Sequence, residues 1–206
     1  MIARMDFIGA VGAVRREVVA TTHEGEPART VVAERSYDAE VADVWDALTN
    51  PDRIPRWFLP ISGDLRVGGR YQLEGQAGGT ITACEPPLHL AVTWEYDGEV
   101  SWVDVHLSAA SDGTTLRLEH IAHVDDKKWD EYGPGAVGVG WDLTIVALAE
   151  HLETGEQVVP DLAGPDALGF MRASSDDWCR ASIEGGTPAE EATAAAARTA
   201  AAYTGG

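Results

Sequence analysis

Apolar residues recur at helical spacing over one long stretch of the chain, residues 136–153. The stripe consists of Val137, Trp141, Thr144, Ile145, Leu148 and Leu152. Because Asp142 and Glu150 lie off this stripe, the pattern predicts an amphipathic helix that buries one face. A Gly-Pro-Gly run at 133–135 prevents the helix from continuing upstream, and Gly155 stands where a C-cap is expected.

Upstream of this helix, apolar and polar residues alternate with a period of two, which is typical of β-strands. The predicted strands are residues 11–20, 28–37, 70–74, 79–84, 88–95, 101–108 and 114–122. Turns rich in Gly and Pro separate most of them, which predicts an antiparallel sheet. One parity carries Tyr71, Leu73, Leu88, Leu90, Val92, Trp94, Val103, Val105, Leu107, Leu116, Leu118 and His120. The other parity carries polar residues such as His89, Asp104 and His106, and we expect it to face water.

Two short helices are predicted between the second and third of these strands. Residues 41–48 repeat apolar side chains at helical spacing, with Asp38 placed as the N-cap. A second helical piece, begun by Pro51, carries Trp57 and Phe58. We therefore expect an aromatic pair close to a helix break.

The segment after the long helix predicts two further helices, at residues 164–184 and 187–203. Its large apolar side chains are Phe170, Met171, Trp178 and Ile183. Leaving an indole in water forfeits the free energy of burying its large apolar surface, so a tail without a packing partner is not expected. We expect the tail to cover apolar surface, either of its own chain or of a second copy in a homodimer.

Composition narrows the range of partners. The chain has 206 residues, of which 45% are hydrophobic, and a formal net charge of −19. Its length suits one packed domain with an appendage, and its acidity would repel nucleic acid and anionic membrane surfaces. No apolar run reaches transmembrane length, and the N-terminal residues lack the features of a signal peptide. With only Cys84 and Cys179, far apart in sequence, we expect a cytoplasmic protein with reduced thiols.

Several short motifs follow one another in order between about Thr30 and Glu153. They are Val41–Thr49, Pro51, Arg56-Trp57-Phe58, Gly68-Gly69-Arg70-Tyr71, Gly79-Thr80-Ile81, Pro86-Pro87, Leu90, Thr93-Trp94-Glu95, Thr115-Leu116, His120 and Gly140-Trp141. This order resembles the heat-shock-protein-90 ATPase activator homologue family of the START-like, or SRPBCC, superfamily. The resemblance implies an α+β helix-grip fold, in which a curved antiparallel sheet wraps around a long C-terminal helix.

The resemblance also implies a division of the chain and a kind of site. Residues 30–154 form the predicted helix-grip domain, residues 1–29 an extension that pairs with it as a strand, and residues 155–206 a helical extension. Between sheet and helix, the family fold often encloses a cavity for a small apolar or amphipathic molecule. The loop at 124–135 is expected to act as its lid. No shared catalytic residue and no cofactor are implied.

Seven residues are candidates for lining this cavity: Trp57, Phe58, Tyr71, Trp94, His120, Trp141 and Ile145. The same residue types also fill a core, so lining and filling remain alternatives. His120 shares the parity of Leu116 and Leu118, so it contacts either a ligand or a hydrogen-bond partner within the core.

Catalytic signals are weak along the whole chain. No GxSxG nucleophile elbow occurs, and the apolar parity contains no pair of acids for general acid–base work. His120 and His123 have opposite parity, so no metal site is predicted there. These observations favour binding over catalysis. The alternatives are a co-chaperone-like or dimer-forming interaction protein and, less favoured, an enzyme that uses the same cavity.

Overall fold

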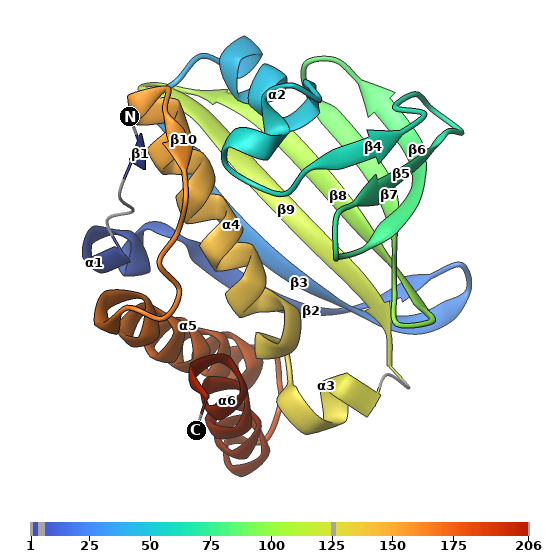
Figure 1. Cartoon of the computed structure of the whole chain (residues 1–206). Coiled ribbons are helices and arrows are strands. Elements are labelled where there is room, and N and C mark those ends of the chain that lie inside the picture. Colours follow the sequence, from blue (N-terminus) through green and yellow to red (C-terminus); the bar gives the residue numbers. More distant parts are fainter. Residues whose placement is uncertain (1, 4–6, 125–126, 206) are drawn as a thin grey trace. The chain divides into compact units, whose positions relative to one another are not determined.

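The computed structural model describes every residue except 1, 4–6, 125, 126 and 206 (Figure 1). It divides into two compact units. The sheet unit comprises Met1–Met5, Glu34–His120 and Ala147–Val159. The helical unit comprises Asp6–Ala33, Ile121–Val146 and Pro160–Gly206.

Eight strands form the main sheet, in the order β2-β3-β9-β8-β7-β6-β5-β4. Their bounds are β2 Arg15–His23, β3 Glu26–Tyr37, β4 Ile61–Gly63, β5 Arg70–Leu73, β6 Gly78–Glu85, β7 His89–Tyr96, β8 Glu99–Ala110 and β9 Gly113–His123. Strands β4 to β8 pair antiparallel with one another in succession. Two further short strands, β1 (Ile2–Ala3) and β10 (Gln157–Val158), pair in parallel.

The alternation along these strands determines which side chains are buried, as the sequence predicts. Tyr71 and Leu73 on β5 are buried, and the same parity is buried on β8 and β9. On β7 every residue from His89 to Glu95 is half-buried, so both faces of this strand are partly covered. The prediction for Leu88 is wrong, because this residue precedes β7 and its side chain is 51% exposed.

The two short helical pieces of the sheet unit are α2 (Val41–Thr49) and the 3-10 turn η2 (Ile54–Arg56). The N-cap of α2 is Glu40 and not Asp38, and Glu40 makes no side-chain capping bond. The Trp57 indole donates to the carbonyl of Ala47 at 3.0 Å, which fixes the end of η2 against α2.

The C-terminal part of α4 (Gly135–Thr154) joins this arrangement through a buried histidine. Arg53 Nε donates to His151 Nε2 at 3.1 Å, and His151 Nδ1 donates to the carbonyl of Glu156 at 2.7 Å. Because one ring nitrogen donates and the other accepts, this imidazole is neutral. Burial also lowers its pKa.

The helical unit contains α1 (Phe7–Ala10), η1 (Val11–Ala13), α3 (Lys127–Tyr132), α5 (Pro165–Glu184) and α6 (Ala189–Thr204), together with the first part of α4. The prediction of two helices in the tail is confirmed by α5 and α6, which pack against each other (Figure 1). Phe170, Met171 and Trp178 are buried within one chain, where α5 contacts β2, η1 and α1. Ile183 departs from the expectation, because its side chain is 39% exposed.

Glycines in the first half of α4 let the tail helices approach closely. A Cβ placed at Gly138 would lie 2.3 Å from Trp178 Cε2, and one at Gly135 would lie 2.8 Å from Thr199 Cγ2. Cβ atoms at Gly133 and Gly140 would lie 3.3 Å from Ala195 Cβ and from the Tyr203 hydroxyl, so all four glycines between positions 133 and 140 lie at the approach of α5 or α6. The expected lid at 124–135 is partly helical: α3 covers 127–132, and Thr199 Oγ1 donates to the carbonyl of Tyr132 at 2.8 Å. Residues 125 and 126 of that lid lie outside the described residues.

Asp142 departs from the amphipathic pattern predicted for α4. It lies off the apolar stripe, and yet it has no exposed surface. Its Oδ2 accepts from Arg16 Nε at 2.9 Å, from the Trp178 indole at 3.1 Å and from the Ser174 hydroxyl at 2.5 Å. Arg16 also bonds to Asp177 Oδ2 at 2.8 Å. Burial raises the pKa of Asp142, and Arg16, Ser174 and Trp178 act against that rise. The residue is a buried ionic centre of the helical unit.

Candidate ligand-binding site

An apolar cluster on the sheet unit brings together three of the predicted site residues. Its buried members are Tyr71, Leu73 and Ile81. The hydrophobic side chains packed against them are only partly buried: Phe58, Leu59, Ile61, Leu65, Leu90, Val92 and Trp94. We call these ten residues the apolar cluster. A core that is surrounded by half-covered hydrophobic side chains retains apolar surface that a ligand can cover.

Trp57 and Phe58 have different roles in this part of the chain. Trp57 is buried and tied to α2 through its indole, whereas Phe58 belongs to the apolar cluster. Their rings stack with centroids 5.6 Å apart and an interplanar angle of 21°. Trp57 therefore holds Phe58 in place.

Tyr71 reaches across the sheet from β5 to β7. In the register of the strands it lies opposite Gly79 on β6, and its hydroxyl donates to the carbonyl of Thr93 at 2.8 Å. A Cβ at Gly79 would lie 2.0 Å from that same carbonyl oxygen, so only glycine fits there. Burial raises the pKa of the Tyr71 phenol, which keeps it a neutral donor. The ring is thus fixed at both ends.

A polar pair adjoins the aromatic part of the cluster. Ser101 lies directly opposite Trp94 across the β7–β8 pair, and its hydroxyl donates to the Trp94 carbonyl at 3.2 Å. His120 on β9 has its Nε2 2.9 Å from the Ser101 hydroxyl and its ring edge-on to Trp94, with centroids 6.4 Å apart. Because the serine proton goes to a carbonyl, the imidazole Nε2–H donates to the serine oxygen.

The charge state of His120 follows from its surroundings. The side chain is 4% exposed, and burial lowers its pKa to about 4. The imidazole is therefore neutral at pH 7 and donates toward Ser101, so it does not act as a base toward that hydroxyl. In this geometry the imidazole does not activate the serine as a nucleophile.

The sequence analysis did not foresee Ser101. It shares the parity of Val103 and Val105, which is a signal that it faces the apolar side of the sheet. Its position opposite Trp94 depends on the strand register, which one sequence does not specify. Trp141 and Ile145 are buried in the part of α4 that belongs to the helical unit, and their membership of the site remains a prediction.

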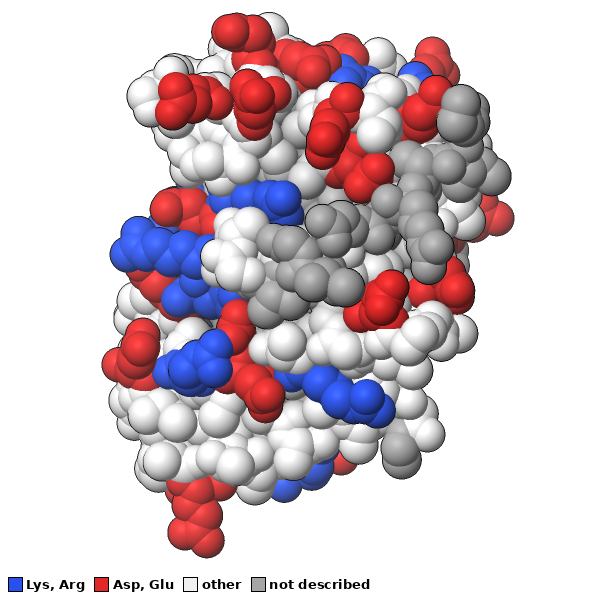
Figure 2. Space-filling model, turned by 90° about the vertical axis from the view of Figure 1, so that its left-hand side faces the viewer, with Lys and Arg blue, Asp and Glu red and all other residues white. Residues whose placement is uncertain are grey.

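The surface of the protein carries both signs of charge. On the face drawn in Figure 2, acidic and basic side chains lie interspersed among uncharged ones. None of the helices in the described part of the chain is long and apolar enough to span a bilayer.

Comparisons with known proteins agree with this fold. Residues 38–153 match the family described as Activator of Hsp90 ATPase homolog 1-like protein. The crystal structure of CalU16 from Micromonospora echinospora is 35% identical, with a TM-score of 0.70 over 82% of this chain and 98% of CalU16. Its solution structure gives 34% identity and a TM-score of 0.72 over 84% and 97% of the two chains. No curated protein matches the chain.

Two more distant solved structures cover less of the chain. MLL2253 from Mesorhizobium loti is 26% identical, with a TM-score of 0.54 over 61% of this chain and 97% of its own. DynU16, from the dynemicin biosynthetic locus, is 25% identical, with a TM-score of 0.55 over 62% of this chain and 48% of its own. The similarity to CalU16 thus covers more of the chain than the matched residues 38–153.

Proposed function

Because the chain belongs to the Activator of Hsp90 ATPase homolog 1-like family, with the α+β helix-grip fold of the START-like superfamily, we propose that it binds a small apolar or amphipathic molecule. The observation that carries the proposal is the apolar cluster, whose aromatic members Phe58 and Trp94 are only half-buried. Ligand sites are mostly apolar and contain a few placed polar groups, and here His120 and Ser101 supply them. DynU16 comes from a biosynthetic locus, which fits a small-molecule ligand.

We propose binding and not catalysis as the role of these groups. The His120 imidazole and the Tyr71 phenol already donate their protons to Ser101 and to the Thr93 carbonyl, so they order the apolar surface that a ligand would cover. Covering the exposed part of the cluster would gain about 25 cal/mol for each Å² of apolar surface removed from water. The proposed location is the cytoplasm, where Cys84 and Cys179 persist as free thiols.

The test compares two tryptophans of the same strand pair. The native full-length chain should bind an apolar fluorescent probe saturably and near 1:1. Trp94→Leu removes a member of the apolar cluster and should weaken binding at least tenfold, since it loses stacking and contact area. Trp102→Leu is the matched control, because Trp102 has the opposite parity on β8 and is also half-buried. It should bind the probe as the wild type does.

A polar variant extends the test to selectivity. His120→Leu should alter the ranking among probes that differ only in a polar substituent, with the folded state verified by circular dichroism. The absence of saturable binding across a panel of apolar and amphipathic probes would overturn the proposal, as would equal losses in Trp94→Leu and Trp102→Leu.

The family name motivates the second candidate function, a co-chaperone-like interaction with a protein partner. This function predicts that the chain stimulates the ATPase rate of Hsp90, and that the effect persists in Trp94→Leu. A dimer-forming interaction protein predicts instead a doubled mass in sedimentation. Both results differ from the one expected for the proposed function, in which a monomeric chain binds the probe.

A further inference from the structure

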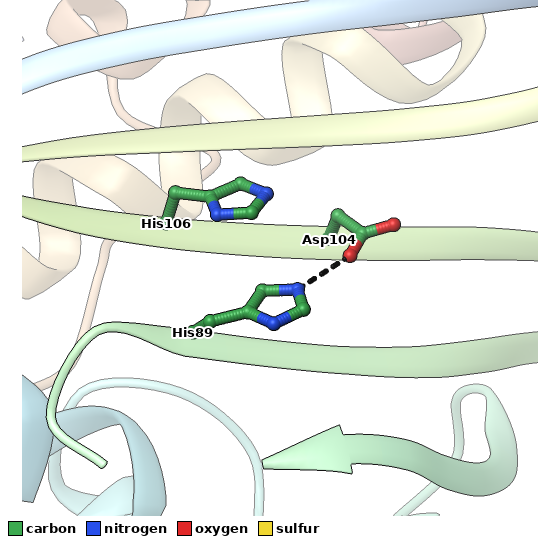
Figure 3. A group of neighbouring side chains, drawn as sticks. All are labelled: His89, Asp104 and His106. Atoms are coloured by element: carbon green, nitrogen blue, oxygen red, sulfur yellow. Dashed lines mark hydrogen bonds and ion pairs between the residues drawn. The ribbon is translucent and has the colours of Figure 1, made fainter. Parts of the chain in front are cut away.

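A second polar group lies on the other face of the same strand pair. His89 on β7 and Asp104 and His106 on β8 project from one side of the two strands, and both rings extend toward the carboxylate (Figure 3). Their parity is opposite to that of Leu90, Val103 and Val105. The group is therefore separate from the apolar cluster and independent of the proposed function.

The register of β7 and β8 creates this arrangement. His89 lies directly opposite His106, and Ala91 lies opposite Asp104. Since Ala91 has only a methyl group, the His89 ring reaches Asp104 diagonally, and its Nε2 lies 2.8 Å from Oδ1. The two imidazoles stack with centroids 4.4 Å apart and an interplanar angle of 5°.

One donor atom from each residue lies within 4.8 Å of the other two. Ligands of a tetrahedral zinc ion lie about 3.3 Å from one another, given metal–ligand distances of about 2.0–2.2 Å. The His89 Nε2 to Asp104 Oδ1 distance of 2.8 Å has to widen by about 0.5 Å to meet this spacing. The exposed His106 ring has to turn out of its stack with His89 to complete the set. All three side chains are at least partly exposed, so an ion has access from solvent.

The donor set has the chemistry of a transition-metal site. Two imidazole nitrogens and one carboxylate oxygen suit Zn²⁺ and its neighbours, whereas Mg²⁺ prefers oxygen ligands alone. Glu85 Oε1 lies 3.9 Å from His89 Nδ1, where it would orient the ring once Nε2 binds a metal. The net charge of −19 also concentrates cations near the surface.

We propose that His89, Asp104 and His106 bind one divalent transition-metal ion, with water completing the coordination. The ion binds Nε2 of the neutral His89 tautomer that carries its proton on Nδ1, so an Nε2 proton is either exchanged through solvent to Nδ1 or, from an imidazolium, released to solvent, and the ion lies between Nε2 and the Asp104 carboxylate. The bound ion bridges β7 and β8 on the face opposite Trp94. The ion thereby cross-links the two strands.

Isothermal titration of the full chain, first stripped with a chelator, tests the proposal with Zn²⁺ as the probe. We expect saturable binding near 1:1, little or no binding of Mg²⁺, and a rise in Tm with added Zn²⁺. His106→Asn and Asp104→Asn should each weaken Zn²⁺ binding at least about tenfold. Loss of a residue that only orients a ligand already lowers metal affinity by about that factor, and loss of a direct ligand lowers it further. The double variant His89→Asn/His106→Asn should abolish it.

Two matched controls remove the same residue types elsewhere. His23→Asn on β2 and Asp112→Asn in the β8–β9 turn should leave Zn²⁺ affinity unchanged. Nitrogen-15 spectra of the wild-type protein test the site without a variant. Zn²⁺ should change the chemical shifts of the His89 and His106 imidazole nitrogens selectively. Unchanged affinity in the double variant, shifts confined to other histidines, or no saturation at millimolar Zn²⁺ would each overturn the assignment.

Discussion

One buried ionisable side chain from each unit, His120 in the sheet unit and Asp142 in the helical unit, is satisfied in a different way. In the sheet unit, the His120 ring bonds to the Ser101 hydroxyl beside a half-buried Trp94. In the helical unit, Asp142 accepts from Arg16, Ser174 and Trp178, all through one oxygen. Burial favours the neutral form of both groups, but only Asp142 has a counter-ion.

The difference separates a binding role from a structural one. The partners of Asp142 come from β2 and α5, so they join segments far apart in sequence, and Arg16, Ser174 and Trp178 are themselves buried. His120 instead joins neighbouring strands and adjoins surface that remains accessible. Breaking each centre should therefore have a different consequence.

The largest expected effect comes from removing the counter-ion of Asp142. Arg16→Met leaves a buried carboxylate without its charged partner, which should lower the free energy of unfolding by about 3–5 kcal/mol. Arg15→Met, at the neighbouring position where the side chain is 67% exposed, should change it by less than about 0.5 kcal/mol. Chemical denaturation of both variants measures the contrast. Equal values for the two would show that Asp142 does not need Arg16.

The second effect concerns pH and belongs to His120. Its folded pKa of about 4 lies below the ordinary 6.5, so the unfolded chain binds the proton first as pH falls. The stabilising contribution is fully present above about pH 6.5 and is lost between pH 6.5 and 4, by about 3 kcal/mol in total. His120→Gln does not titrate there, so its deficit relative to the wild type should shrink by that amount from pH 7 to pH 4. A constant difference would contradict the buried neutral imidazole.

Much of the fold was predictable because it depends on local pattern. Period-two alternation placed Tyr71, Val103 and Leu118 on the buried face, and helical spacing with Gly155 as a stop located α4 within one residue at each end. These signals need no knowledge of distant partners. The ordered motifs were sufficient to predict the family.

What the sequence did not reveal at Asp142 and at the polar group on β7 and β8 depends on contacts between residues distant in sequence. Asp142 lies off the apolar stripe, and its burial is explained only by Arg16, which lies 126 residues away in sequence. The grouping of His89, Asp104 and His106 depends on the β7–β8 register, which polar residues on a half-exposed face do not specify. Within the site, Tyr71, Phe58 and Trp94 were foreseen, but Ser101 was not.

A smaller effect tests how tightly Trp178 is held beside Asp142. Alanine normally stabilises a helix by about 1 kcal/mol relative to glycine. Gly138→Ala should instead destabilise by about 1–3 kcal/mol, because the new Cβ would meet the Trp178 ring at 2.3 Å. Gly169→Ala, in α5 with no atom within 4 Å of its would-be Cβ, should stabilise the protein. The midpoint temperature of thermal unfolding should fall for Gly138→Ala and rise for Gly169→Ala. A gain at both positions would mean that α5 moves aside at little cost.

The smallest effect probes the sheet unit without touching a charge. Tyr71→Phe keeps the ring opposite Gly79 but removes the hydroxyl that donates to the Thr93 carbonyl at 2.8 Å. A neutral hydrogen bond of this kind contributes about 0.5–1.5 kcal/mol, so unfolding free energy should fall by about 1 kcal/mol. Because the ring remains in the apolar cluster, affinity for an apolar probe should be retained within about twofold, whereas Trp94→Leu loses it. If Tyr71→Phe weakened probe binding as strongly as Trp94→Leu, the phenol hydroxyl would contact the ligand and would not serve only to stabilise the sheet.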